Sequence, residues 1–132
     1  MQSPRLAAAA AAVLALEGAA LTIVAMVEIF GLSAGEAASL PTAIALIVLT
    51  LIGAAALFAF AVGARRGRTW ARSGGVVLQV LALALALASL TVQPVLWTFV
   101  LGVGAPALIG LVLLVASARR ESIEPTEDSA AD

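Results

Sequence analysis

Charged and strongly polar positions are scarce along this chain, and they divide it into four long apolar runs. Each run has about the 20 mostly apolar residues that a helix needs to cross the hydrocarbon core of a bilayer. The runs cover residues 6–30, 41–63, 70–91 and 95–118. The pattern predicts an all-α fold, a bundle of four transmembrane helices with short loops, in which residues 1–118 form one membrane domain.

Several residues indicate where the helices begin, end or bend. Pro41 suits the first turn of the second helix, where its missing N–H costs nothing. Thr69 is a candidate cap for the third helix, and Gln93-Pro94 favours a tight turn between the third and the fourth. Pro106 lies in the middle of the fourth run, where we expect it to kink the helix.

The basic residues give the orientation. All seven are arginine, and they lie at Arg5, within 65–72, and at 119–120. In a four-helix protein these three places are on the same side of the membrane, and cytoplasmic segments are the ones enriched in Lys and Arg. The loops 31–40 and 91–94 contain one Glu and no Arg. We therefore expect a multi-pass protein of the cell membrane with both termini in the cytoplasm.

The two ends of the chain allow further expectations. Residues 119–132 are polar, acidic and contain a proline, so we expect a disordered cytoplasmic tail. A cleaved signal peptide ending near residues 18–20 is the alternative interpretation of the first run. The apolar run continues to Phe30, and Glu17 would stand just before the cut, so the sequence favours an intact helix.

Composition excludes most soluble and catalytic classes. The chain is 63% hydrophobic and 11% charged, whereas a soluble domain is about half apolar and about a quarter charged. It has no cysteine and no histidine, which removes disulfides, thiol chemistry and the commonest metal ligands and general bases. We expect no enzyme activity, no metal and no cofactor. The arginines stand where membrane topology requires them, so we expect no nucleic-acid binding either.

Glu17 is the residue with the highest free-energy cost of insertion into a membrane, because it lies in the middle of the first run. At 1.5 Å per residue it is about 18 Å beyond Arg5, near the bilayer midplane, where an ionised side chain costs about 3 kcal/mol. Glu28 is on nearly the same helix face, but near the outer interface, where we expect it to keep its water. We expect Glu17 to face the bundle interior as the neutral acid, since burial disfavours the ionised form.

Gln79 is the expected hydrogen-bond partner of Glu17. Beyond the arginine at its start, Gln79 is the only strongly polar residue within the third run, and its depth overlaps that of Glu17. Thr22 and Thr50 are weaker candidates, because a hydroxyl can bond to the carbonyls of its own helix. The pair has two interpretations, a structural hydrogen bond or a proton- or cation-handling site. The lack of a second buried charge favours the structural one.

Two further groups of residues are candidate sites. The first is the loop cluster of Arg65, Arg66, Arg68, Trp70 and Arg72. It suits either a topology anchor at the lipid headgroups or a site for an anionic headgroup or phosphorylated ligand, and the anchor explains it without any ligand. The second is the small-residue stripe of the fourth run, which would allow a neighbouring helix to approach closely. It consists of Gly102, Pro106 and Gly110.

Residues 67–80, "GRTWARSGGVVLQV", resemble the central loop of a group of uncharacterised actinobacterial four-helix integral membrane proteins. The shared pattern is a Gly-Arg-x-Trp-Ala-Arg loop with a glutamine seven residues after the last arginine. The matching residues here are Gly67, Arg68, Trp70, Ala71, Arg72 and Gln79. Relatives often have a proline where this chain has Gly74, so the entry to the third helix could differ. The resemblance implies a bacterial membrane location and no particular activity.

The sequence therefore predicts a structural or accessory membrane component. Its expected partners are membrane lipids, and possible ones are other membrane proteins or further copies of the chain. The alternative is a small proton-coupled transporter that uses Glu17. Small multidrug-resistance exporters also have four helices and a membrane glutamate in the first. Their substrate sites are lined by aromatic residues, however, and this chain has no tyrosine and two tryptophans, both near the membrane interfaces.

Overall fold

A computed structural model describes residues 4–35 and 38–121 of the chain. This part contains four helices and no strand: α1 (Pro4–Ser33), α2 (Leu40–Arg65), α3 (Thr69–Ser89) and α4 (Trp97–Glu121). Each helix is long and apolar enough to cross a membrane. The predicted fold class, an all-α protein with four potential membrane spans, is confirmed.

The helix ends differ from the predicted ones by a few residues. α1 and α2 extend further at both ends than predicted. α3 ends earlier, at Ser89 instead of 91, and α4 begins later, at Trp97 instead of 95. Thr69 was expected to cap the third helix, but it is already helical, and Arg68 occupies the cap position without a side-chain hydrogen bond. α4 continues through Arg119 and Arg120, because these residues favour helix and basic side chains suit its carboxyl end. The rest of the predicted disordered tail, 122–132, lies outside the described residues.

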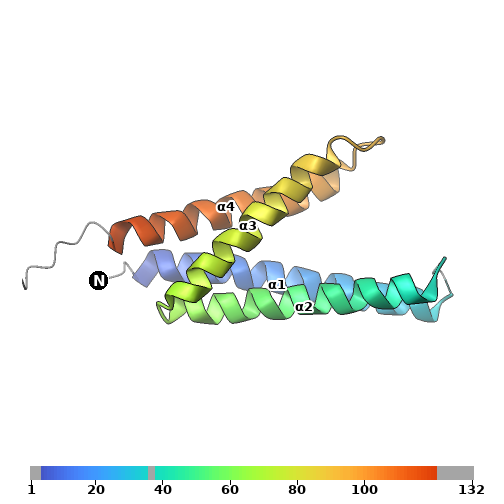
Figure 1. Cartoon of the computed structure of the whole chain (residues 1–132), viewed down its shortest axis with the longest axis horizontal. Coiled ribbons are helices and arrows are strands. Elements are labelled where there is room, and N and C mark those ends of the chain that lie inside the picture. Colours follow the sequence, from blue (N-terminus) through green and yellow to red (C-terminus); the bar gives the residue numbers. More distant parts are fainter. Residues whose placement is uncertain (1–3, 36–37, 122–132) are drawn as a thin grey trace, which may run out of the picture.

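The helices are arranged as two antiparallel hairpins, α1 with α2 and α3 with α4 (Figure 1). Both hairpins come together where α1 begins, where α2 is joined to α3, and where α4 ends. All three arginine-bearing segments belong to this end, which we call the arginine end. At the opposite end the α3–α4 turn stands away from the α1–α2 turn (Figure 1).

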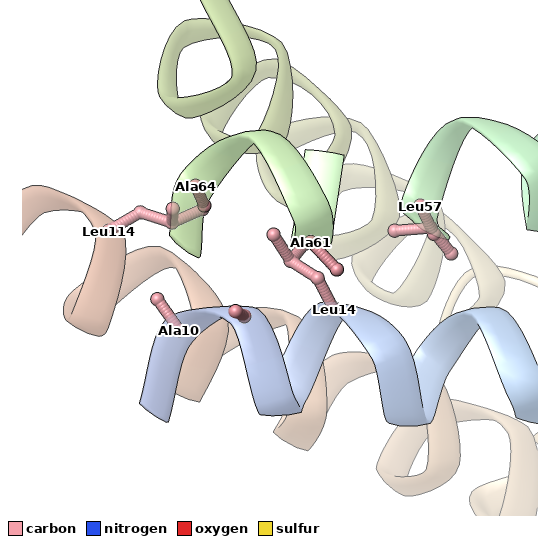
Figure 2. Close-up of a cluster of buried hydrophobic side chains, with 7 residues drawn as sticks. Ala10, Leu14, Leu57, Ala61, Ala64 and Leu114 are labelled. Carbon is pink, nitrogen blue, oxygen red and sulfur yellow. The ribbon is translucent and has the colours of Figure 1, made fainter. Parts of the chain in front are cut away.

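The hydrophobic core lies in the half of the bundle near the arginine end. Small residues predominate in it, and they allow helix backbones to approach closely. The buried cluster consists of Ala10, Ala11, Leu14, Leu57, Ala61, Ala64 and Leu114, from α1, α2 and α4 (Figure 2). The core thus joins the two hairpins at the arginine end.

The turn between α2 and α3 has a compact and specific geometry. Gly67 has a φ of +69°, a left-handed conformation that favours glycine. Its N–H bonds to the carbonyl of Ala64, and the N–H of Arg68 bonds to the carbonyl of Gly63. These two bonds form a Schellman motif that ends α2. A Cβ at Gly63 would collide with the methyl group of Ala71, so glycine here lets α3 begin directly against α2.

Large apolar side chains cover the outside of the bundle. Leu16, Leu49, Leu81 and Leu101, one from each helix, are all more than half exposed. Contact of so much apolar surface with water is unfavourable, whereas contact with lipid tails or with other membrane helices suits it. The surface therefore agrees with a location in the membrane.

Candidate functional site: a polar pair at the base of an apolar cavity

The structure brings together the two polar residues that the sequence pairs. Gln79 Nε2 of α3 donates a hydrogen bond to Glu17 Oε2 of α1 over 2.7 Å. Gln79 is 1% exposed, and Glu17 is half-buried. Because α1 and α3 belong to different hairpins, this hydrogen bond connects the two halves of the bundle.

Gly110 of α4 provides the space for the Gln79 amide. A Cβ at this position would lie 2.5 Å from Gln79 Nε2 and 2.9 Å from its Cδ, which is too close for either atom. The sequence suggested that Gly110 allows two backbones to approach. Its role in the structure is instead to accommodate a polar side chain, which the small-residue pattern alone did not indicate.

A cavity of about 460 Å³ adjoins the pair, and it is half open to the outside of the bundle, because lining side chains such as Leu81 and Leu85 are exposed. Residues from all four helices line it, and its wall is apolar apart from Glu17 and Gln79. The lining residues are Glu17, Ala20, Leu21 and Val24 of α1, Gly53 and Leu57 of α2, Leu78, Gln79, Leu81, Ala82 and Leu85 of α3, and Gly102, Val103 and Pro106 of α4.

The polar pair lies at the end of the cavity that is nearer the arginine end. Along α1 the lining runs from Glu17 to Val24, and along α3 from Leu78 to Leu85. Both helices start at the arginine end, so in each case the lining extends away from it. The cavity therefore occupies the half of the bundle in which the hairpins diverge, with Glu17 and Gln79 at its base.

Tight apolar packing closes the bundle between this base and the arginine end. Leu14 and Leu114 are fully buried there. A Cβ at Gly75 would lie 3.1 Å from Leu114 and 3.6 Å from Leu14, so α3 packs directly against both side chains. We call these three residues the apolar plug. It separates the Glu17 carboxyl from the arginines.

The hydroxyl groups of α1 and α2 do not take part in the site. Thr22 donates to the carbonyl of Gly18 at 2.8 Å, and Thr50 donates to that of Leu46 at 2.9 Å. Each hydroxyl is therefore satisfied within its own helix, which is the behaviour that made both residues weaker candidates as partners of Glu17.

The second carboxyl of α1 differs from its expected environment. Glu28 was expected to keep its water at the interface, but its Oε2 atom is buried and forms no hydrogen bond with the described residues. The position of Glu28 along the helix follows from the sequence. The sequence did not show that the neighbouring side chains would cover this oxygen.

The arginine cluster does not act as one uniform surface. Arg65, Arg66, Arg68 and Trp70 are exposed, as an anchor at lipid headgroups requires. Arg72 is buried, at 8% exposure, and its Nη2 donates to the carbonyl of Gly67 at 3.2 Å. The prediction that Arg72 belongs to the exposed anchor was wrong, because one turn into α3 its side chain packs inside the bundle and holds the α2–α3 turn.

The residues of the predicted packing stripe of α4 also have different environments. A Cβ at Gly102 would meet no atom within 4 Å, so no neighbouring helix among the described residues packs against Gly102, and packing against another chain stays a prediction. Gly102 and Pro106 instead line the cavity, and α4 is continuous through Pro106. Proline has no N–H to donate to the carbonyl of Gly102, so this carbonyl lacks its usual helical partner on the lining face of α4.

No protein-family model, curated protein or solved structure matches this sequence.

Proposed function

We propose that the protein is a structural or accessory component of the cell membrane, without catalytic activity, whose two hairpins are held in register by Glu17 and Gln79. The observation that carries the proposal is the 2.7 Å hydrogen bond between these side chains. It connects α1 with α3, and Gly110 of α4 leaves space for it. Three helices thus contribute to one partly buried polar contact.

The surroundings of the pair support a structural role. The apolar plug lies between Glu17 and the arginine end, and a carboxyl that exchanged protons with that side would need a polar path there. The exposed apolar faces offer contact area for lipids, for other membrane proteins or for further copies of the chain. With both termini in the cytoplasm, the exposed Arg65, Arg66 and Arg68 would lie at the cytoplasmic headgroups.

Purification from the native membrane in a mild detergent tests the accessory role. We expect a stoichiometric membrane-protein partner or a defined homo-oligomer, retained in Glu17→Gln, because an amide can still pair with Gln79. A chain that purifies as a monomer in lipid nanodiscs, without any partner after cross-linking in intact cells, would contradict this role.

The cavity favours a second candidate, a small proton-coupled transporter. A carboxyl at the base of a cavity that extends towards one end only, with packed side chains beyond it, is the arrangement that alternating access requires in one of its states. Proton flux measured in liposomes that contain only this protein tests the idea. Flux by the wild type that Glu17→Gln abolishes would support transport, and equal passive leak in both would exclude it.

A further inference from the structure

We propose that the cavity between the hairpins is a binding site for a lipophilic amine, whose ammonium group pairs with the Glu17 carboxylate while its apolar body lies against Leu21, Leu57 and Leu78. The proposal rests on the same cavity as the transporter candidate, but it requires no transport. Binding and flux can therefore succeed or fail independently.

The dimensions of the cavity suit a small organic molecule. Its volume of about 460 Å³ lies within the range of about 300–1,000 Å³ that is typical of ligand sites. Such sites combine a mostly apolar wall with a few polar groups that fix the orientation of the ligand. Here the wall is apolar, and the polar groups, Glu17 and Gln79, lie together at the base.

The polar group at the base selects the charge of the ligand. Glu17 is the only titratable residue among those that line the cavity from α1, α2, α3 and α4. An ionised carboxylate accepts hydrogen bonds at about four lone-pair positions, and Gln79 Nε2 occupies one of them. A ligand ammonium can occupy others, and it supplies the opposite charge that an apolar wall cannot. An anionic ligand would find no opposite charge among the residues that line the cavity.

The proton balance gives the proposal a distinctive signature. If Glu17 is neutral in the free protein, binding of an ammonium ion breaks the carboxyl O–H bond and releases one proton to the solvent. An ionic N–H···O hydrogen bond then forms in its place. The affinity should consequently rise with pH, by up to about tenfold per unit for as long as the free protein keeps Glu17 protonated. A simple alkyl ammonium remains charged at neutral pH, as the lysine side chain does.

Calorimetric titration of the full chain in phosphatidylcholine nanodiscs tests the proposal, with 4-phenylbutylamine as probe and the neutral 4-phenylbutanol as its matched control. We expect the wild type to prefer the amine roughly ten- to a hundredfold, the range of a hydrogen bond to a charged group. Glu17→Gln should lose that preference. Titration in buffers of different ionisation enthalpy should show about one proton released per amine bound by the wild type.

Two further controls separate the cavity from the lipid and from misfolding. Nanodiscs without protein give the partitioning of both probes into lipid, which is subtracted. Gly102→Leu fills the cavity from α4 at a position where a new side chain has open space, so it should fold normally and weaken amine binding at least about tenfold. Circular dichroism and gel filtration check the fold of each variant.

Equal binding of the amine and the alcohol by the wild type would overturn the proposal and indicate an apolar occupant such as a lipid tail. Amine binding that survives in Glu17→Gln, or in folded Gly102→Leu, would overturn it as well. Proton flux without amine binding would keep the transporter candidate and exclude this class of ligand. Amine binding without flux would keep the binding site and exclude transport.

Discussion

Gln79 Nε2 lies 2.7 Å from Glu17 Oε2, although the two residues are 62 positions apart in the chain and belong to different hairpins. Both residues lie in helices that are long and apolar enough to cross a membrane, where polar side chains have few alternative partners. The contact therefore gives the Gln79 amide and the Glu17 carboxyl a hydrogen-bond partner, and it forms the base of the cavity.

Replacing Glu17 should leave the fold intact. Glu17→Gln keeps a group that can accept the hydrogen bond from Gln79, so we expect wild-type thermal stability in detergent. Glu17→Leu removes the bond and should cost less than about 1 kcal/mol, because hydrogen bonds between membrane helices average below that value. A loss of several kcal/mol in either variant would show that the carboxyl belongs to a larger charged network.

The protonation state of Glu17 can be observed directly. We expect Glu17 to be the neutral acid at pH 7, because the apolar wall of the cavity and the apolar plug disfavour a charge there. Infrared difference spectra between the wild type and Glu17→Gln should show the loss of a protonated carboxyl band. Loss of a carboxylate band instead would show an ionised Glu17 and would require a cation close to it.

Alanine substitutions at Gly110 and Gly102 of α4 test whether the Gln79 amide needs the space at Gly110, with Gly102 as the matched control. Gly110→Ala places a methyl group against that amide, and we expect it to displace Gln79 and to cost about 1–3 kcal/mol, as overpacking commonly does. Gly102→Ala meets open space and should be neutral, or stabilising by up to about 1 kcal/mol through helix propensity. Chemical unfolding in mixed micelles measures both, and equal effects would contradict the geometry.

Arg72 and Arg68 should contribute differently to the free energy of unfolding, although both belong to the same loop motif. Arg72→Ala removes a buried guanidinium that bonds to the carbonyl of Gly67, so we expect a loss of about 1.5–3 kcal/mol in unfolding free energy. Arg68→Ala changes an exposed side chain and should remain within about 0.5 kcal/mol of the wild type. Similar losses in both variants would contradict the separate roles of the two arginines.

The orientation in the membrane can be tested by fusions. A reporter after Asp132 and another inserted after Arg66 should both report the cytoplasm, and one at Gly35 should report the outside, because arginine-rich segments resist translocation. Replacing Arg65, Arg66 and Arg68 together should give mixed insertion. A cytoplasmic signal at Gly35 would reverse the topology.

The sequence by itself determined the features that depend on position along a helix. Four apolar runs predicted four spanning helices, because the bilayer sets a minimum length and the helix rise converts residues into distance. The same arithmetic placed Glu17 and Gln79 at a common depth and made them candidate partners. It also placed the arginines at one end, since an even number of antiparallel helices returns the chain to its starting side.

Only the tertiary structure decided which way each helix faces. Apolar residues surround these helices on all sides, so no polar stripe in the sequence fixes their rotation, in contrast to the amphipathic helices of soluble proteins. For this reason the burial of Arg72, the different roles of Gly102 and Gly110, and the covered oxygen of Glu28 could not be predicted. The cavity could not be predicted either, because it depends on how far the two hairpins diverge. That divergence is set by packing between residues distant in the chain, such as Leu14, Gly75 and Leu114, whose contacts have no local signature.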